Sequence, residues 1–375
     1  MKTELGSPAP RIRSWCEDQV KKGKLEKAPD AAALHASCAR LATEHRLNSY
    51  PPPELMPARP GPDGSFELSA EQVRGWKDFL SRYHVNAIEV SPPHRYFKDP
   101  SKDKEPIARY LRSWDRALDA IGRGNLLCYT YLIDEPNDKE AYEFTRTWGR
   151  AVREAGSRVK VLVTEQTKTQ DPSWGDLYGA IDIWVPLFSL FDAETAAARR
   201  SLGEEIWTYT ALCQGEPTPW WHTDFPLLNY RISAWIAWLH HMKGLLYWGG
   251  MSYWNAVDDP WTQPETYGGE GTYEERMKKG AVFNGEGSLL YPGSAAGIEG
   301  PVPSMRLKAI RDGLDDFDYL TLLESLGQRA AAEALVQTVA GGWHEWSRDP
   351  ELCFHARRRL GCVIHNFYKA KESKG

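Results

Sequence analysis

Two neighbouring carboxylates, Asp134 and Glu135, directly follow a run of apolar, aromatic and β-branched residues at 126–133. Such a run is typical of a strand that is buried on both faces. Pro136 then ends the strand because it has no N–H for the ladder, and Asp138 caps a helical pattern. Because β/α barrels carry their catalytic residues where strands open into such loops, we predict that both acids do chemistry.

The structural alternative is that Asp134 is a turn residue and Glu135 a partner of the helix dipole. We favour the catalytic interpretation because acids at strand ends are over-represented at functional sites. Adjacent residues leave a strand toward opposite sides, so this pair is poorly placed to flank one bond as the nucleophile and acid of a conventional glycosidase.

The pair can divide the work if the substrate supplies its own nucleophile, the oxygen of a 2-acetamido group. One carboxylate then holds the acetamido N–H and balances the oxazolinium charge, while the other protonates the leaving oxygen. The alternative is a two-carboxylate scheme in which Glu135 works with Glu89 or Glu165 from another predicted strand.

Strand and helix patterns alternate along most of the chain. We predict strands at 45–49, 85–90, 126–133, 159–164, 181–187, 205–211, 243–248 and 288–291. Helices are predicted between most of them, and two more at 10–45. This alternation favours a (β/α)8 TIM-type barrel over a doubly wound sheet. We expect an N-terminal helical segment at 1–44, the catalytic barrel at 45–326 and a C-terminal helical extension at 327–375, packed on the barrel.

The composition excludes several classes of protein. The 46 basic and 51 acidic residues give a net charge of −5, which argues against a nucleic-acid-binding surface. There is no apolar run of about 18 residues and no signal-peptide pattern, so we expect no membrane span and a cytoplasmic protein, or a secreted one whose leader was removed. Cys-x-x-Cys, His-Glu-x-x-His and Walker motifs are missing, so we predict neither a metal nor a cofactor.

Aromatic residues are unusually frequent, with 16 Trp in the chain. Trp and Tyr rings suit the C–H faces of sugars, although large aromatics also fill the cores of α/β proteins. Four aromatics at or just past predicted strand ends are our candidates for the wall of a substrate pocket, and two polar residues at the end of the second strand are expected at the same rim. These six are Tyr209, Trp248, Trp254, Tyr291, Glu89 and His94.

Three segments are specific enough to compare with known families. They are Tyr-Leu-Ile-Asp-Glu-Pro at 131–136, Gly-Leu-Leu-Tyr-Trp at 244–248 with Tyr-Trp-Asn at 253–255, and Gly-Glu-Gly-Ser-Leu-Leu-Tyr-Pro-Gly at 285–293 running into 300–320. In these segments the chain resembles glycoside hydrolase family 123, the β-N-acetylgalactosaminidases. The resemblance covers most of 45–326 and implies a (β/α)8 barrel. Two departures from the family pattern are expected. We expect no N-terminal β-sandwich, because the predicted barrel begins within about 45 residues, and Glu286 stands where the family usually has the Asp of a Gly-Asp-Gly motif.

By this resemblance, Asp134 orients the acetamido group and Glu135 is the acid/base of a retaining, substrate-assisted hydrolysis. The expected activity is exo-acting on glycans or glycosides that end in β-linked N-acetylgalactosamine (GalNAc). Two alternatives stay open. One is a hydrolase for N-acetylglucosamine (GlcNAc) or for both sugars, since only the C4 hydroxyl separates the two. The other is a sugar-binding barrel without turnover.

Overall fold

The structure is a computed structural model that describes residues 1–212, 214–254, 257–263 and 283–372. By its internal contacts the chain divides into two compact units. The central unit holds residues 48–209 together with Lys2, and the terminal unit holds residue 1, 3–47 and 210–375. Each unit is described separately below.

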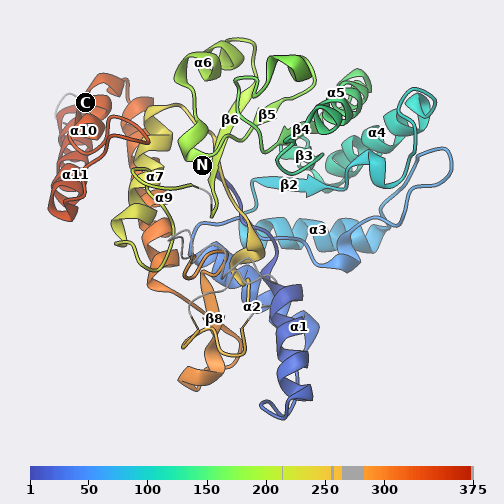
Figure 1. The fold of residues 1–375 in the computed structure, drawn as a ribbon, viewed down its shortest axis with the longest axis horizontal. Helices are drawn as coiled ribbons and strands as arrows, with labels where there is room; N and C mark the ends of the chain where they lie inside the picture. The colour runs from blue at the N-terminus through green and yellow to red at the C-terminus, as the bar shows by residue number, and fades with distance from the viewer. Residues whose placement is uncertain (213, 255–256, 264–282, 373–375) are drawn as a thin grey trace. The chain divides into compact units, whose positions relative to one another are not determined.

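The central unit alternates strands and helices, as the sequence predicts (Figure 1). Its strands are β2 (Ala87–Val90), β3 (Leu127–Tyr131), β4 (Lys160–Val163), β5 (Ile183–Trp184) and β6 (Glu205–Thr210, whose last residue belongs to the terminal unit). Its helices are α3 (Ala70–Tyr83), α4 (Lys104–Ile121), α5 (Lys139–Glu154) and α6 (Ala193–Ser201). Neighbouring strands from β2 to β6 all pair in parallel.

Local capping signals explain where these helices begin. Ser69 and Gln72 form a reciprocal capping box at the start of α3. Asp138 accepts a hydrogen bond from the Ala141 amide at the start of α5, and Asp192 caps α6 in the same way. The acidic residue that follows the β3 loop therefore fixes the start of the next helix, which limits the length of the loop that carries Asp134 and Glu135.

Strand register shows which central residues share a face of the sheet. Glu89 pairs with Tyr129, and Tyr131 pairs with Leu162 on the next strand. Because side chains alternate along a strand, Thr164, two residues beyond Leu162, is on the same face as Tyr131. This register brings Tyr131 and Thr164 together at the ends of β3 and β4.

The terminal unit is mostly helical. It contains β1 (Lys2–Glu4, whose first residue belongs to the central unit), α1 (Pro8–Lys21), α2 (Ala31–Glu44), α7 (Leu228–Leu239), β7 (Gly244–Tyr247), the hairpin of β8 (Leu290–Pro292) with β9 (Pro301–Pro303), α9 (Met305–Ser325), α10 (Arg329–Gln337) and α11 (Pro350–Glu372). The buried Asp316 of α9 accepts hydrogen bonds from Arg231 and Trp235 of α7 and pairs with Arg357 of α11. A buried carboxylate needs such partners, so Asp316 ties three helices together.

The strands of the described residues form a seven-stranded sheet in the order β1-β7-β6-β5-β4-β3-β2, apart from the β8–β9 hairpin. With helices following most strands, this is the α/β architecture of a TIM-type barrel, and the predicted fold class is confirmed. The C-terminal helices α10 and α11 follow it, also as predicted.

Two predicted strands are wrong in detail. Residues 45–49 are not a strand, because His45 is the C-cap of α2 and Arg46 turns the chain with a φ of 62°. The strand next to β7 is instead β1, whose three residues are too few to show an alternating pattern. The predicted strand at 288–291 exists as β8, but it pairs antiparallel with β9 rather than joining the main sheet.

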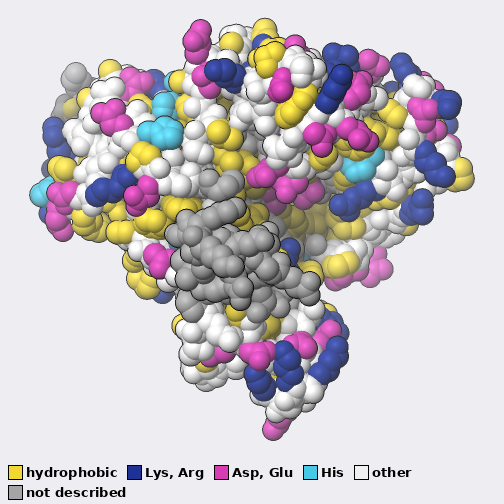
Figure 2. Space-filling model, viewed as in Figure 1, with side chains coloured by type: hydrophobic (Ala, Val, Ile, Leu, Met, Phe, Trp, Pro, Cys, Tyr) yellow, Lys and Arg dark blue, Asp and Glu magenta, His cyan; other side chains and the backbone are white. Residues whose placement is uncertain are grey.

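The surface agrees with the nearly balanced charge of the sequence. On the face drawn in Figure 2, Lys and Arg side chains lie among Asp and Glu side chains. No helix of the described residues is long and apolar enough to cross a membrane.

Candidate active site

Asp134 lies in the loop after β3, and its carboxylate is held by two hydroxyl groups. The Tyr131 hydroxyl donates to Asp134 Oδ1 at 2.6 Å, and Thr164 Oγ1 donates to the same oxygen at 2.9 Å. Burial, reinforced by the Asp134 carboxylate, raises the pKa of Tyr131 well above its usual value. The phenol therefore stays protonated and remains a donor to Asp134 at any physiological pH.

The side chain of Glu135 has a different partner from those of the Asp134 carboxylate, whereas its backbone shares Thr164 with Asp134. Its backbone N–H donates to Thr164 Oγ1 at 2.9 Å, and its side-chain Oε1 accepts a hydrogen bond of 2.5 Å from the Tyr209 hydroxyl near the end of β6. Glu135 has a φ of 43°, in the left-handed region that non-glycine residues seldom adopt. The two carboxylates therefore accept hydrogen bonds from different donors, which suits them to two separate roles.

Glu165, next to Thr164, is a third carboxylate in this part of the central unit. It is buried, its Oε1 accepts from the Gln166 amide, and its Oε2 accepts from Gln170 Nε2 at 2.8 Å. Gln170 Nε2 also lies within hydrogen-bonding distance of the Pro136 carbonyl oxygen, at 3.3 Å. Gln170, which donates to Glu165, thus links the loop after β4 to the loop that carries the acidic pair.

Burial raises the pKa of Glu165 to about 7 from its usual 4.5, although hydrogen bonds from Gln170 and Gln166 oppose the shift. Between these pH values the folded protein keeps a proton that the unfolded chain has released. The free energy of unfolding should therefore fall as pH rises from about 4.5 to about 7, by up to about 1.4 kcal/mol per pH unit, and then level off. Urea unfolding at pH 5, 6, 7 and 8 measures this slope.

Glu165→Gln is the matched variant for this prediction, because glutamine keeps the shape of the side chain but does not titrate. We expect its free energy of unfolding to vary less between pH 5 and 7 than that of the parent protein. Equal slopes for the two proteins would show that Glu165 does not hold its proton in this range.

The two polar candidates of the second strand have different surroundings. Glu89 is on the face of the sheet that Tyr129 shares, and burial raises its pKa while the charge of Arg95 opposes the rise. The His94 ring instead packs against Phe144 and Trp148 of α5, with centroid distances of 5.1 and 5.9 Å. These contacts give His94 a packing role on α5, so we do not include it in the proposed site.

Trp248 belongs to a separate cluster in the terminal unit. Its indole N–H donates to Glu286 Oε1 at 2.5 Å, and its ring packs against Tyr253. His222 Nε2 lies 2.9 Å from Glu286 Oε2, and both side chains are fully buried. The Gly-Glu-Gly turn therefore places a buried carboxylate between an indole and an imidazole.

The other two aromatic candidates are engaged in the structure of the terminal unit. Trp254 is fully buried (0% exposed), donates to the Leu290 carbonyl and packs against Trp15. Its ring presents no free face to a sugar, so the expectation that it forms a pocket wall gives way to a core role. The Tyr291 hydroxyl accepts a hydrogen bond from Arg306, which also donates to the Gly285 carbonyl.

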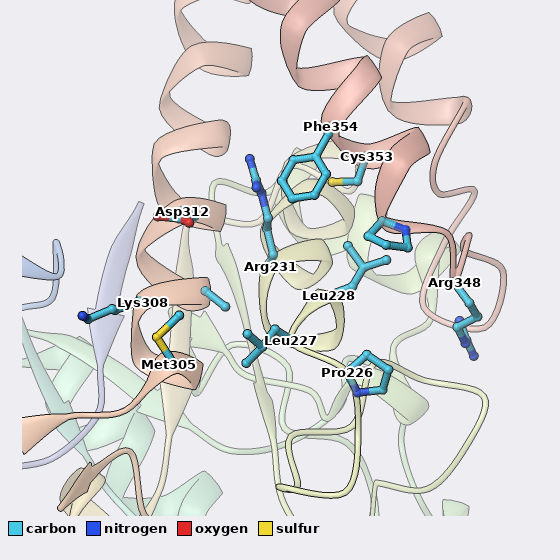
Figure 3. A pocket seen from close by; sticks show the side chains of 12 residues that line it. Pro226, Leu227, Leu228, Arg231, Met305, Lys308, Asp312, Arg348, Cys353 and Phe354 are labelled. Atoms are coloured by element: carbon cyan, nitrogen blue, oxygen red, sulfur yellow. The ribbon is translucent and has the colours of Figure 1, made fainter.

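A cavity of about 380 Å³ lies in the terminal unit among the first turns of α7, α9 and α11 (Figure 3). Its lining is mostly apolar, and it includes Leu227, Met305 and Phe354. It contains none of the predicted catalytic or substrate-binding residues. Among the described residues, no three His, Cys, Asp or Glu side chains are gathered as metal ligands would be.

Sequence reasoning did not find Tyr131 and Thr164 as partners of the acids. Tyr131 is part of the buried strand, and Thr164 immediately precedes Glu165, which was itself a candidate catalytic acid. The usable signal is positional: both are hydroxyl residues at the ends of strands that neighbour each other in a parallel sheet. Such positions meet at the same rim of a barrel.

A TIM-type barrel with paired acids after one of its strands is an arrangement that glycoside hydrolases use, among other enzymes. The model of the glycoside hydrolase 123 catalytic domain matches residues 98–323, more than half of the chain. The chain therefore belongs to glycoside hydrolase family 123, and it is a glycoside hydrolase.

No curated protein matches the chain. Among solved structures, the Ignisphaera aggregans GH53 catalytic domain is similar at 12% identity, covering 58% of this chain and 77% of that chain, with a TM-score of 0.26.

Proposed function

We propose that this glycoside hydrolase is a retaining exo-β-N-acetylgalactosaminidase that acts by substrate-assisted catalysis. Asp134 orients the 2-acetamido group of the substrate and balances the charge of the oxazolinium intermediate. Glu135 protonates the leaving oxygen and then activates the water that opens the intermediate. The observation that supports this proposal is that the two adjacent carboxylates accept hydrogen bonds from different donors, Asp134 from Tyr131 and Thr164, and Glu135 from Tyr209.

The rival two-carboxylate scheme requires an ionised nucleophile opposite Glu135. Both oxygens of Glu165 accept hydrogen bonds within its own loop, and its pKa of about 7 favours the neutral form over much of the acidic range. Burial also raises the pKa of Glu89. Burial therefore disfavours the ionised form that the two-carboxylate scheme requires of either residue.

In this proposal the substrate is a glycan or glycoside with a terminal β-linked GalNAc. Tyr209, which contacts the proposed acid/base, is the best-supported residue of the sugar pocket. In the central unit Glu89 stays a proposed substrate-binding residue. In the terminal unit Trp248 and Tyr291 stay proposed substrate-binding residues, described for that unit alone. We also keep 45–326 as the proposed catalytic region, with helical segments before and after it.

Paired aryl glycosides test the proposal. We expect 4-nitrophenyl β-GalNAc to be hydrolysed, and the corresponding β-galactoside to react more than roughly 10³-fold more slowly, because it lacks the intramolecular nucleophile. Release of 4-nitrophenol measures both rates. A galactoside cleaved as fast as the acetamido sugar would remove the substrate nucleophile from the mechanism. A 4-nitrophenyl β-GlcNAc control shows whether the enzyme distinguishes the C4 hydroxyl.

A further inference from the structure

The hydroxyl of Thr164 is the atom that both acids share. Thr164 Oγ1 lies 2.9 Å from the Glu135 backbone nitrogen and 2.9 Å from Asp134 Oδ1. We propose that Thr164 is the positioning residue of the acidic pair, which holds Glu135 in its left-handed conformation and sets the direction of the Asp134 carboxylate. The catalytic meaning of this inference rests on the proposed function of the pair.

The φ/ψ preferences of a non-glycine residue before proline disfavour the backbone conformation of Glu135. Its φ of 43° brings the side chain close to its own backbone, a cost that non-glycine residues seldom bear. The next residue, Pro136, restricts the backbone of Glu135 further. A conformation that local preferences disfavour persists only where surrounding contacts fix it, and the Thr164 hydroxyl supplies such a contact to the Glu135 amide.

The position of this hydroxyl is set by the sheet and not by the loop that it holds. Thr164 follows β4 directly and is 2% exposed. The Leu132 amide donates to the Leu162 carbonyl, which extends the pairing of β3 with β4 up to the loop. Because threonine is β-branched, its side chain has few rotamers. The anchor is therefore stiffer than the segment that carries the acids.

The hydrogen-bonding capacity of Thr164 matches its two partners. A hydroxyl has one hydrogen to donate and lone pairs to accept with. Thr164 accepts from the Glu135 N–H and donates to Asp134, while Tyr131, 2.8 Å away, donates to the same Asp134 oxygen. Removing the hydroxyl would leave the Glu135 amide without this acceptor and Asp134 with one donor fewer, so both acids should shift together.

Two variants separate the hydroxyl from the bulk of the side chain. Thr164→Val keeps the branched shape and removes the hydroxyl, whereas Thr164→Ser keeps the hydroxyl. Thr130→Val is the matched control, because Thr130 is a fully buried threonine of β3 whose hydroxyl has no hydrogen-bond partner among the described residues. Each variant is crystallised, and its kcat and KM on 4-nitrophenyl β-GalNAc are measured with its thermal unfolding midpoint.

For Thr164→Val we expect Glu135 to relax to a negative φ and kcat to fall by about 10²-fold, the effect of misplacing a catalytic group by roughly 1 Å. KM should change only a few-fold. Thr164→Ser and Thr130→Val should keep the parent φ and a kcat within a few-fold of the parent.

Several results would overturn the inference. One is a Thr164→Val crystal structure in which Glu135 keeps its positive φ. Another is a Thr164→Ser enzyme whose kcat falls by about 10²-fold. This result would show that the hydroxyl alone does not position the pair, even if Thr164→Val does not fold. An inactive parent enzyme would instead count against the proposed function, and the φ of Glu135 in the variants would still test the positioning role.

Discussion

Glu135→Gln should lose about 10² to 10⁴-fold in kcat/KM on substrates with poor leaving groups, and less than about tenfold on activated aryl glycosides. The reason is that general-acid assistance is worth this much when the departing oxygen needs a proton, and little when it leaves as a stable anion. The measurement is a series of aryl β-GalNAc substrates of decreasing leaving-group pKa. The dependence of log(kcat/KM) on that pKa should become steeper in the variant.

The control for the lost charge is Glu140→Gln, an exposed position in the first turn of α5. It removes the same charge from the same unit, and its rates should match those of the parent. If Glu135→Gln slows good and poor leaving groups equally, Glu135 is not the acid. The Tyr209 hydroxyl donates to Glu135 Oε1, and the amide oxygen of glutamine can accept the same hydrogen bond. The substitution therefore keeps the side chain in place and removes only its ability to give a proton.

Asp134→Asn should slow the hydrolysis of 2-acetamido substrates by about 10² to 10³-fold, and by the same factor across the whole leaving-group series. The loss has the size expected when one preorganised electrostatic contact to the developing charge is removed. It does not depend on the leaving group, because Asp134 acts on the attacking acetamido group. Asparagine can still accept from Tyr131 and Thr164 through its amide oxygen, so the position should be kept.

Binding gives a second measurement for Asp134→Asn. A thiazoline that copies the cyclised acetamido sugar should bind the parent enzyme more tightly than the variant, and isothermal titration would show the difference. A leaving-group dependence in Asp134→Asn that resembles the one expected for Glu135→Gln would mean that the two acids have the opposite roles.

The pattern of elements was predictable because its causes are local. The capping box of Ser69 with Gln72 and the Asp138 cap lie within a few residues of the helices that they start. The apolar, aromatic and β-branched residues at 126–133 predict a buried strand by their composition alone. The three-residue β1 carries no such signal, since a strand that short shows no periodicity, and its place in the sheet depends on β7.

The surroundings of the acids were not predictable, because they come from residues far away in the chain. Thr164 is 29 positions from Glu135, and Tyr209 is 74 positions from it. The register between parallel strands decides which of these hydroxyls meet the carboxylates. Packing against residues far away in the chain also makes Trp254 a core residue. In the sequence, Trp254 and Trp248 both lie at or just past the end of the same predicted strand.

The sequence by itself determined the alternation of strands and helices, the family and the location of Asp134 and Glu135 after a buried strand, since each follows from short-range composition and spacing. Only the tertiary structure decided the left-handed turn at Glu135 and the three hydroxyls that hold the pair. A strained backbone has no local signature; it exists because contacts between separate strands stabilise it.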